Sequence, residues 1–436
     1  MNRLIQRITH WLALAVILLS LTPVASVAAT PGEIICALEY TTQTGDQLRD
    51  LAQRYLGQAE AYPAILVATR LKLTEDKSFA DVADPERVAP GSKLCIPKQE
   101  ETERLLKTVV DALGRATYFE RPPQRIAIAG KASFLLADAL YTFPQAQERV
   151  ITLPQGGQAV SGFLSVLDAK FAQKIFLETD AGPEQIAAAQ PDVVILKSYM
   201  ADKLGTPLEQ LNIPVVYLDL ETPEQYMRDV TTLGQLIGDS ARAEQVRAFY
   251  RTRLERVIQA TETLDPAEKP SVLLAQYTEK GGQSAFSVPP AAWIQTRLVE
   301  MAGGVPVWAE AAQGGGWTVV NMEQIAAWNP DIIAVIVYTA DPSQVVRQLK
   351  ADAQWQLLNA VQNGRLYAFP KDYNSWDQPD TRWILGLVWL AGRLHPDRFV
   401  DLDMRQEMAY FYQNLYELDK TTLEMTILPR LQGDVQ

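Results

Sequence analysis

A nine-residue segment occurs twice in this chain, and the repeat restricts the folds available to it. Residues 184–192 read EQIAAAQPD and residues 323–331 read EQIAAWNPD, so seven of the nine positions are identical. Each copy runs directly into an apolar, β-branched stretch, at 193–196 and 332–337. A helix that leads into a buried strand, repeated at this spacing, predicts two related α/β lobes rather than one continuous sheet. Two such lobes predict a cleft between them.

The length and charge of the chain limit its class and its partners. With 436 residues, of which 47% are hydrophobic, the chain can bury several cores, and its length predicts about three domains. The formal net charge is −12. This acidic balance disfavours nucleic acid and anionic membrane surfaces as partners.

The amino terminus has the layout of a secretory signal peptide. Two arginines precede an apolar run at 11–21, and small residues follow it. We expect a signal peptide at residues 1–29, cleaved after Ala28 or Ala29, and a secreted protein in the periplasm or associated with the cell wall. The alternative is an uncleaved anchor, although the run is shorter than the roughly 20 residues of a spanning helix.

The chain contains only two cysteines, Cys36 and Cys95. In an exported protein the default interpretation is a disulfide, and the weaker alternative is two free thiols. In the chain-entropy model, a bridge over this loop stabilises the segment by about 4 kcal/mol.

The segment 36–97 predicts a small domain with the order strand, helix, helix, strand. It resembles a LysM module, and the resemblance rests on Tyr40, 45–48, 51–55 and 90–97. Such modules bind N-acetylglucosamine-containing glycans, peptidoglycan among them. The resemblance therefore implies glycan contacts from Gly45, Asp46, Gln47 and Leu48. The alternative is a LysM-like spacer without glycan affinity.

The rest of the chain follows the alternation of two lobes. We expect a polar linker at 98–106, a first lobe at 107–239, one long helix at 240–264, a second lobe at 265–425 and a tail at 426–436. The predicted fold class is α/β: two Rossmann-like lobes joined by one long helix and preceded by the small βααβ domain.

The paired repeats, the long helix and the hairpin at 111–115 with the following 122–126 resemble class III periplasmic binding proteins. These proteins deliver cobalamin and iron-siderophore complexes to ABC importers. The resemblance implies that Glu184 and Glu323, each at the start of a repeated helix, dock onto the permease. A carboxylate in the first turn is favoured by the helix dipole and stays exposed to a cationic partner. The alternative is that both are ordinary helix-start carboxylates.

Loops at the carboxyl ends of the strands are expected to line the cleft. Glycine there lets a ligand approach the backbone, and aromatic residues offer a rigid apolar face with a polar edge. Lys131 and Lys197 could neutralise an anionic ligand, although a solvated lysine is the commoner explanation. The candidate ligand-binding residues are Gly130, Lys131, Ser133, Gln155, Ser198, Tyr199, Tyr277, Trp317, Tyr338, Tyr373 and Trp376.

The residue inventory argues against bare metal transport and against most enzymes. Beyond the signal peptide only His395 remains, before Pro396 at a helix end, where a structural role is expected. We expect no protein metal site, no cofactor and no catalytic residues. The predicted ligand is a metal-chelate nutrient: an iron-siderophore, cobalamin or haem. A LysM-targeted cell-wall hydrolase remains an alternative, because 52 acidic residues offer many possible catalytic pairs of carboxylates. A further alternative is a solute sensor, in which the same cleft and glutamates contact a receptor protein.

Overall fold

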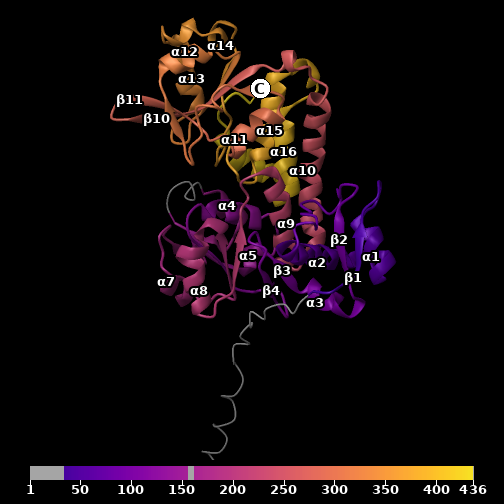
Figure 1. Cartoon of the computed structure of the whole chain (residues 1–436). Coiled ribbons are helices and arrows are strands. Elements are labelled where there is room, and N and C mark those ends of the chain that lie inside the picture. Colours follow the sequence, from indigo (N-terminus) through magenta and orange to yellow (C-terminus); the bar gives the residue numbers. More distant parts are fainter. Residues whose placement is uncertain (1–33, 156–161, 436) are drawn as a thin grey trace, which may run out of the picture.

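The computed structural model describes residues 34–155 and 162–435 (Figure 1). The signal peptide expected at 1–29 lies outside the described residues. Within them, no helix combines the length and the apolarity that crossing a bilayer requires.

The first part of the structure has the predicted order of strand, helix, helix and strand. The elements are β1 (Cys36–Thr41), α1 (Leu48–Leu56), α2 (Tyr62–Glu75) and β2 (Lys93–Pro97). β1 and β2 pair antiparallel, and the disulfide between Cys36 and Cys95, with a Cα–Cα distance of 5.2 Å, ties the first strand to the last. The predicted disulfide is therefore confirmed.

Removing this disulfide is expected to weaken the first domain. The bridge joins residues 59 positions apart, so the double variant Cys36→Ser with Cys95→Ser should lose about 4 kcal/mol of stability in the chain-entropy model. The measurement is urea unfolding followed by circular dichroism. Wild-type protein with a reductant is the control and should shift in the same direction. Identical unfolding midpoints for the oxidised and bridge-free proteins would contradict the expectation.

The segment 98–106 is more structured than the predicted linker. It contains α3 (Thr102–Leu106), and Leu105 is fully buried in the core of the first domain. Helix α3 is only five residues long and buries a single apolar residue. So short a segment has no apolar periodicity that would predict a helix from the sequence. A hairpin of β3 (Thr108–Val110) and β4 (Ala116–Tyr118) follows and pairs antiparallel, as predicted.

The first lobe contains a five-stranded parallel sheet with the order β7-β6-β5-β8-β9. Its central strands β5 and β8 are fully buried and, apart from Lys197, apolar, which is the pattern of a parallel sheet covered on both faces. The elements are β5 (Ile126–Ile128), α4 (Ser133–Leu140), α5 (Ala146–Arg149), β6 (Val150–Pro154), α6 (Phe163–Leu167), β7 (Ile175–Leu177), α7 (Pro183–Ala188), β8 (Val193–Lys197), α8 (Thr206–Gln210), β9 (Val215–Leu218) and α9 (Pro223–Ile237).

A single long helix, α10 (Ser240–Thr261), follows the first lobe and precedes the second. The carboxylate of Asp239 caps it by accepting a hydrogen bond from the backbone N–H of Arg242 at 2.9 Å. Helix α10 contacts α9 of the first lobe and α15 (Trp383–Leu394) of the second, and it runs along both in Figure 1.

The second lobe has a mixed sheet with the order β13-β11-β10-β14-β15. Strands β10, β14 and β15 are parallel, whereas β11 and β13 pair antiparallel. The elements are β10 (Ser271–Lys280), β11 (Gln283–Val288), α11 (Ile294–Met301), β12 (Val305–Pro306), β13 (Thr318–Val320), α12 (Met322–Trp328), β14 (Ile332–Ile336), α13 (Pro342–Ala351), α14 (Asn359–Gln362), β15 (Leu366–Ala368), α15, α16 (Met404–Tyr416) and α17 (Lys420–Thr422).

The two copies of the repeated segment occupy equivalent places in separate sheets. The first copy forms α7 and β8, and β8 lies between β5 and β9. The second copy forms α12 and β14, and β14 lies between β10 and β15. In each lobe the strand of the repeat thus pairs with the first strand of the sheet, so the prediction of two related α/β halves is confirmed.

The first domain is fixed to α9 and α10 by charged contacts. Asp84, in the insertion between α2 and β2, accepts hydrogen bonds from Arg251 Nε at 2.8 Å and Nη2 at 3.0 Å. Arg70 is buried, and its Nη1 donates to Thr232 Oγ1 at 3.4 Å. Burial lowers the pKa of Arg70 to about 10. The domain is therefore docked against the first lobe and the long helix.

Candidate ligand site

The loops after β5 and β8 meet at one edge of the first lobe. Gly130 has a φ of +81°, which a side chain would strain, and Lys131 and Tyr199 are exposed. The Tyr199 hydroxyl donates to the Lys131 carbonyl at 3.3 Å, and Ser198 donates to the carboxylate of Asp219. The structure thus brings Gly130, Lys131, Ser198 and Tyr199 together.

The other candidates of the first lobe are less available. Ser133 begins α4 but is buried, whereas Gln155 is exposed after β6. Lys197 is fully buried and donates to the carbonyl of Asp219 and to Glu221 Oε1, the latter at 2.5 Å. Its charge is already paired, so Lys197 anchors the loop after β9 and is not a free cation for a ligand.

Three half-buried aromatic residues form a wall at the carboxyl edge of the second lobe. The rings of Trp293 and Trp317 meet edge to face with centroids 5.9 Å apart, and those of Trp317 and Tyr338 are 6.4 Å apart. Such edge-to-face contacts hold each ring against its neighbour. We call Trp293, Trp317 and Tyr338 the aromatic wall.

A buried polar group supports the aromatic wall from behind. The Tyr338 hydroxyl donates to Asp377 Oδ2 at 2.7 Å, and Gln295 Nε2 donates to the same oxygen at 3.2 Å. Burial raises the pKa of Asp377 above the usual range of a carboxyl group. Within the described part of the chain, the buried atoms Asp377 Oδ1 and Gln295 Oε1 accept no hydrogen bond.

Sequence reasoning missed part of this arrangement. Trp293 and Gln295 were not among the candidates, although Trp293 follows the turn signal Pro289-Pro290 directly after β11. Asp377 lies in the loop 373–377, which the sequence predicts at the cleft, but its contacts with Tyr338 and Gln295 were not predicted. When the partners of a polar residue lie on distant segments, the neighbouring sequence does not indicate which residues it contacts.

Two aromatic candidates of the second lobe are corrected by their burial. Trp376 is fully buried, and its indole N–H donates to Asp372 at 2.9 Å, so it belongs to the core. Tyr277 does not end a strand, because β10 continues to Lys280 and turns at Gly281-Gly282 into β11. Its ring packs on Phe286 with centroids 5.6 Å apart, and its hydroxyl donates to Glu279 at 3.0 Å.

The lobes meet at a seam that carries Tyr373. Its ring contacts Phe163 of the first lobe with centroids 5.6 Å apart. Beside it, Asn374 Nδ2 donates to Asp138 Oδ2 of α4 at 3.1 Å, and Arg382 Nη1 donates to the same carboxylate oxygen at 2.6 Å. These contacts hold the carboxyl edge of the second lobe against α4.

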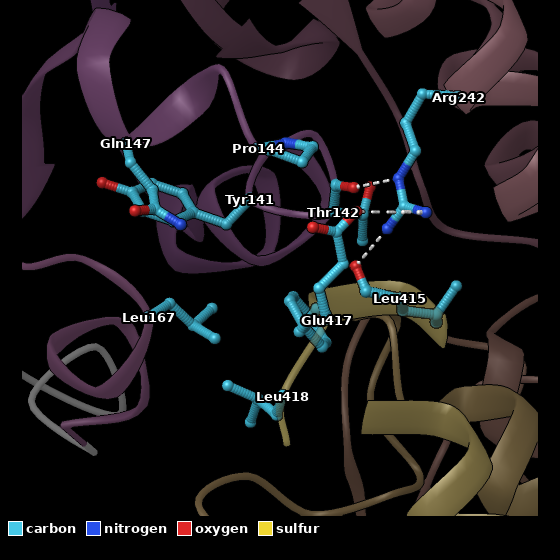
Figure 2. A pocket seen from close by; sticks show the side chains of 10 residues that line it. Tyr141, Thr142, Pro144, Gln147, Leu167, Arg242, Leu415, Glu417 and Leu418 are labelled. Atoms are coloured by element: carbon cyan, nitrogen blue, oxygen red, sulfur yellow. Dashed lines mark hydrogen bonds and ion pairs between the residues drawn. The ribbon is translucent and has the colours of Figure 1, made fainter. Parts of the chain in front are cut away.

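The seam extends to a cavity of about 240 Å³ between α4, α6 and the end of α16 (Figure 2). Arg242 lines one side of it, with Nε donating to the Thr142 carbonyl at 2.7 Å and Nη2 donating to the carbonyls of Asn414 and Leu415 at 3.0 and 2.8 Å. Because its donors are used by backbone acceptors of both lobes, Arg242 has a structural role in joining them.

Glu184 and Glu323 are both exposed in the first turn of their helices, as predicted. The helices begin in similar ways. Gln185 Oε1 accepts from the backbone N–H of Gly182 at 2.9 Å, and Gln324 Oε1 accepts from that of Asn321 at 3.0 Å. The glutamine of the repeat thus closes each helix start and leaves the glutamate directed to solvent. Docking itself remains a prediction.

The glycan candidates are unequal in exposure. Gly45 and Gln47 are exposed, and the half-buried Asp46 accepts from the Tyr40 hydroxyl at 2.7 Å. Leu48 is only 1% exposed in the core of the first domain, which corrects its assignment as a glycan contact.

The described residues contain no group of three or more His, Cys, Asp or Glu side chains that could hold a metal ion. His395 is buried at the end of α15, with Nε2 3.3 Å from the Gly303 carbonyl oxygen, and burial lowers its pKa. This placement fits the structural role that was expected for it.

The comparisons with known proteins all point to periplasmic binding proteins. A family model described as "Periplasmic binding protein" matches residues 146–373. The molybdate-binding protein MolA of Haemophilus influenzae is 27% identical over 249 residues, which are 53% of this chain and 69% of that protein.

Solved structures support the same fold. A periplasmic solute binding protein from Veillonella parvula superposes with a TM-score of 0.60 at 23% identity, covering 74% of this chain and 97% of that one. Helicobacter pylori CeuE, in a Ni-His complex, gives 0.56 at 15% identity, covering 73% and 98%. MolA bound to molybdate gives 0.55 at 17% identity, covering 72% and 98%.

Proposed function

This chain belongs to the periplasmic binding protein family, and from that membership we infer how it uses its cleft. It is an extracytoplasmic, non-enzymatic solute-binding protein of an ABC importer. We propose that it binds a metal-chelate nutrient, an iron-siderophore, cobalamin or haem, between its lobes and presents it to the permease.

The aromatic wall is the observation that supports a chelate most strongly. Trp293, Trp317 and Tyr338 offer apolar ring faces that suit a planar macrocycle or an aromatic chelator. On the first lobe, Lys131 and Tyr199 are exposed and offer a cation and a hydroxyl. A metal that arrives inside its own chelator requires no ligands from the protein. The visible absorption spectrum of protein purified from its native host tests the proposal, because each of the three cargoes absorbs differently.

Removing one ring of the aromatic wall is expected to weaken cargo binding. Trp317→Ala removes the ring that contacts both Trp293 and Tyr338, so affinity should fall by about ten- to a hundredfold. The measurement is the cargo absorbance per mole of purified protein. Tyr410→Ala, which removes a 45% exposed ring on α16, is the matched control and should retain its cargo. Full cargo in Trp317→Ala would exclude the wall from the ligand site.

MolA, the relative described above, favours a second candidate, a tetrahedral oxyanion such as molybdate. Calorimetric titration of the cargo-free protein with molybdate distinguishes the two. A saturable heat with one molybdate per chain would favour the oxyanion, whereas no heat would leave the chelate proposal standing.

We also propose that the first domain is a LysM-like module that binds N-acetylglucosamine glycan. Exposed Gly45 and Gln47, and the neighbouring rings of Tyr40 and Tyr55 with centroids 5.9 Å apart, support a surface of this kind. Cosedimentation with insoluble peptidoglycan tests it. Release of soluble muropeptides would instead favour the hydrolase alternative.

A further inference from the structure

The carboxyl-terminal tail is built into the second lobe beside β15. Gln432 and Lys371 exchange backbone hydrogen bonds of 3.1 and 2.8 Å. The backbone N–H of Asp434 donates to the Ala368 carbonyl at 2.9 Å, and Asp434 Oδ2 accepts from the Ala368 N–H at 2.7 Å. The tail thus extends the edge of the sheet.

Gly433 lets the tail approach this closely. Its φ is +89°, and a Cβ there would lie 2.8 Å from the Phe369 carbonyl oxygen. Its backbone N–H donates to Ser343 Oγ of α13 at 3.2 Å. A glycine is therefore required for the tail to pack between β15 and α13, which makes the tail a fixed wall.

A cavity of about 540 Å³ lies between the tail and the helices α13, α15 and α16. We call it the tail pocket. Its volume falls within the range of small-molecule sites in proteins. None of its lining residues belongs to the aromatic wall or to the seam. The lining residues are Ser343, Arg347, Lys350, Tyr367, Arg393, Arg405, Leu428, Leu431, Gly433, Asp434 and Val435.

Four cations from three helices line the tail pocket, and three of them, Arg347, Lys350 and Arg405, are exposed. Arg347 and Lys350 lie three residues apart on α13, Arg393 belongs to α15 and Arg405 to α16. Arg393 is held in place, because its Nη2 donates to the Asp434 carbonyl at 2.8 Å and its guanidinium lies 5.2 Å from the centre of the Tyr367 ring. The one carboxylate in the lining, Asp434, already accepts from Ala368.

The lining of the tail pocket carries more cationic than anionic side chains. Among the described residues, Arg347, Lys350 and Arg405 form no ion pair with a carboxylate. The chain as a whole has a net charge of −12, so a pocket lined by four cations departs from its general acidity. Like charges brought together repel one another, and a bound anion removes that repulsion.

We propose that the tail pocket binds a phosphate-bearing polyanion, at a site separate from the interlobe cleft. Guanidinium groups that approach from different helices suit tetrahedral oxyanions, because each can donate two hydrogen bonds to phosphate oxygens. The volume exceeds what one phosphate fills, so the ligand carries more than one phosphate or a phosphate on a larger group. A soluble phosphate ester and a phospholipid headgroup share this chemistry.

Calorimetry with pyrophosphate on the full-length chain at low ionic strength tests the proposal. Wild type should bind one pyrophosphate at this site, with affinity falling as salt is raised. The variant R347E/K350E should bind at least about tenfold more weakly. R405E, a single change on another helix, should weaken binding in the same direction. The control R121E/K203E reverses two exposed cations of the first lobe and should bind like wild type.

Vesicles distinguish the two sources of phosphate. Cosedimentation with phosphatidylglycerol vesicles but not phosphatidylcholine vesicles, lost in R347E/K350E, would assign a lipid headgroup. Pyrophosphate binding without vesicle binding would assign a soluble ligand. The proposal is overturned if wild type binds neither probe, or if R347E/K350E and R121E/K203E lose the same affinity. Circular dichroism establishes that each variant is folded, and retained cargo in the cleft separates this result from the function proposed above.

Discussion

Reversing the charges of Glu184 and Glu323 together is expected to abolish permease-dependent uptake while leaving cargo affinity unchanged. Both carboxylates are exposed at the start of the repeated helices, one on each lobe. A lysine at either place would put a cation where a cationic surface of the permease is expected, and like charges across an interface cost several kcal/mol. Each single variant, Glu184→Lys or Glu323→Lys, should lose part of the uptake.

The measurement is uptake of labelled cargo by cells that contain the permease and a receptor variant. Glu224→Lys is the matched control, because Glu224 is also an exposed glutamate in the first turn of a helix, α9, but lies outside the repeat. It should support normal uptake. Normal uptake by the Glu184→Lys with Glu323→Lys double variant would remove both residues from the docking mechanism.

Replacing Arg382 with methionine is expected to destabilise the whole receptor by about 3–5 kcal/mol. Arg382 is fully buried, with Nη1 2.6 Å from Asp138 Oδ2, Nε 2.8 Å from Asp372 Oδ1 and Nη1 3.3 Å from Asp380 Oδ2. Burial raises the pKa of Asp380 to about 8 and also raises that of Asp138. Without the guanidinium, three carboxyl groups would remain buried with no opposite charge.

Urea unfolding followed by tryptophan fluorescence measures this loss. Arg297→Met is the control, because Arg297 makes the same kind of contact, 2.7 Å to Glu300, with both side chains exposed. Exposed pairs contribute about 0–1 kcal/mol, so its unfolding should hardly change. Equal stability of Arg382→Met and wild type would show that the network does not hold the lobes together.

The sequence predicted the features that depend on local pattern. The repeat at 184–192 and 323–331 identified two helices and two strands, because a buried strand and its preceding helix leave a regular apolar pattern. The disulfide followed from Cys36 and Cys95 being the only cysteines of an exported chain. These inferences needed no knowledge of which distant residues meet.

The features that were missed depend on contacts between distant segments. Asp138 and Arg382 are 244 positions apart, and nothing near either residue indicates the other. Trp376 is an aromatic residue in a polar loop, which made it a cleft candidate. Its hydrogen bond to Asp372 instead holds the indole ring in the core. The hairpin of β10 and β11 did have a local signal, since Gly281-Gly282 is a turn sequence that would have extended the strand past Tyr277.

The buried network around Arg382 also limits how a transporter can recognise a loaded receptor. Swinging the halves apart would draw Asp138 away from Arg382 and Asn374 and bring water to groups that are now dry. A wide change of shape is therefore a costly signal for this molecule. If Glu184 and Glu323 dock onto the permease as predicted, we expect the permease to detect occupancy by contacting the cargo directly rather than by sensing a wide closure of the lobes.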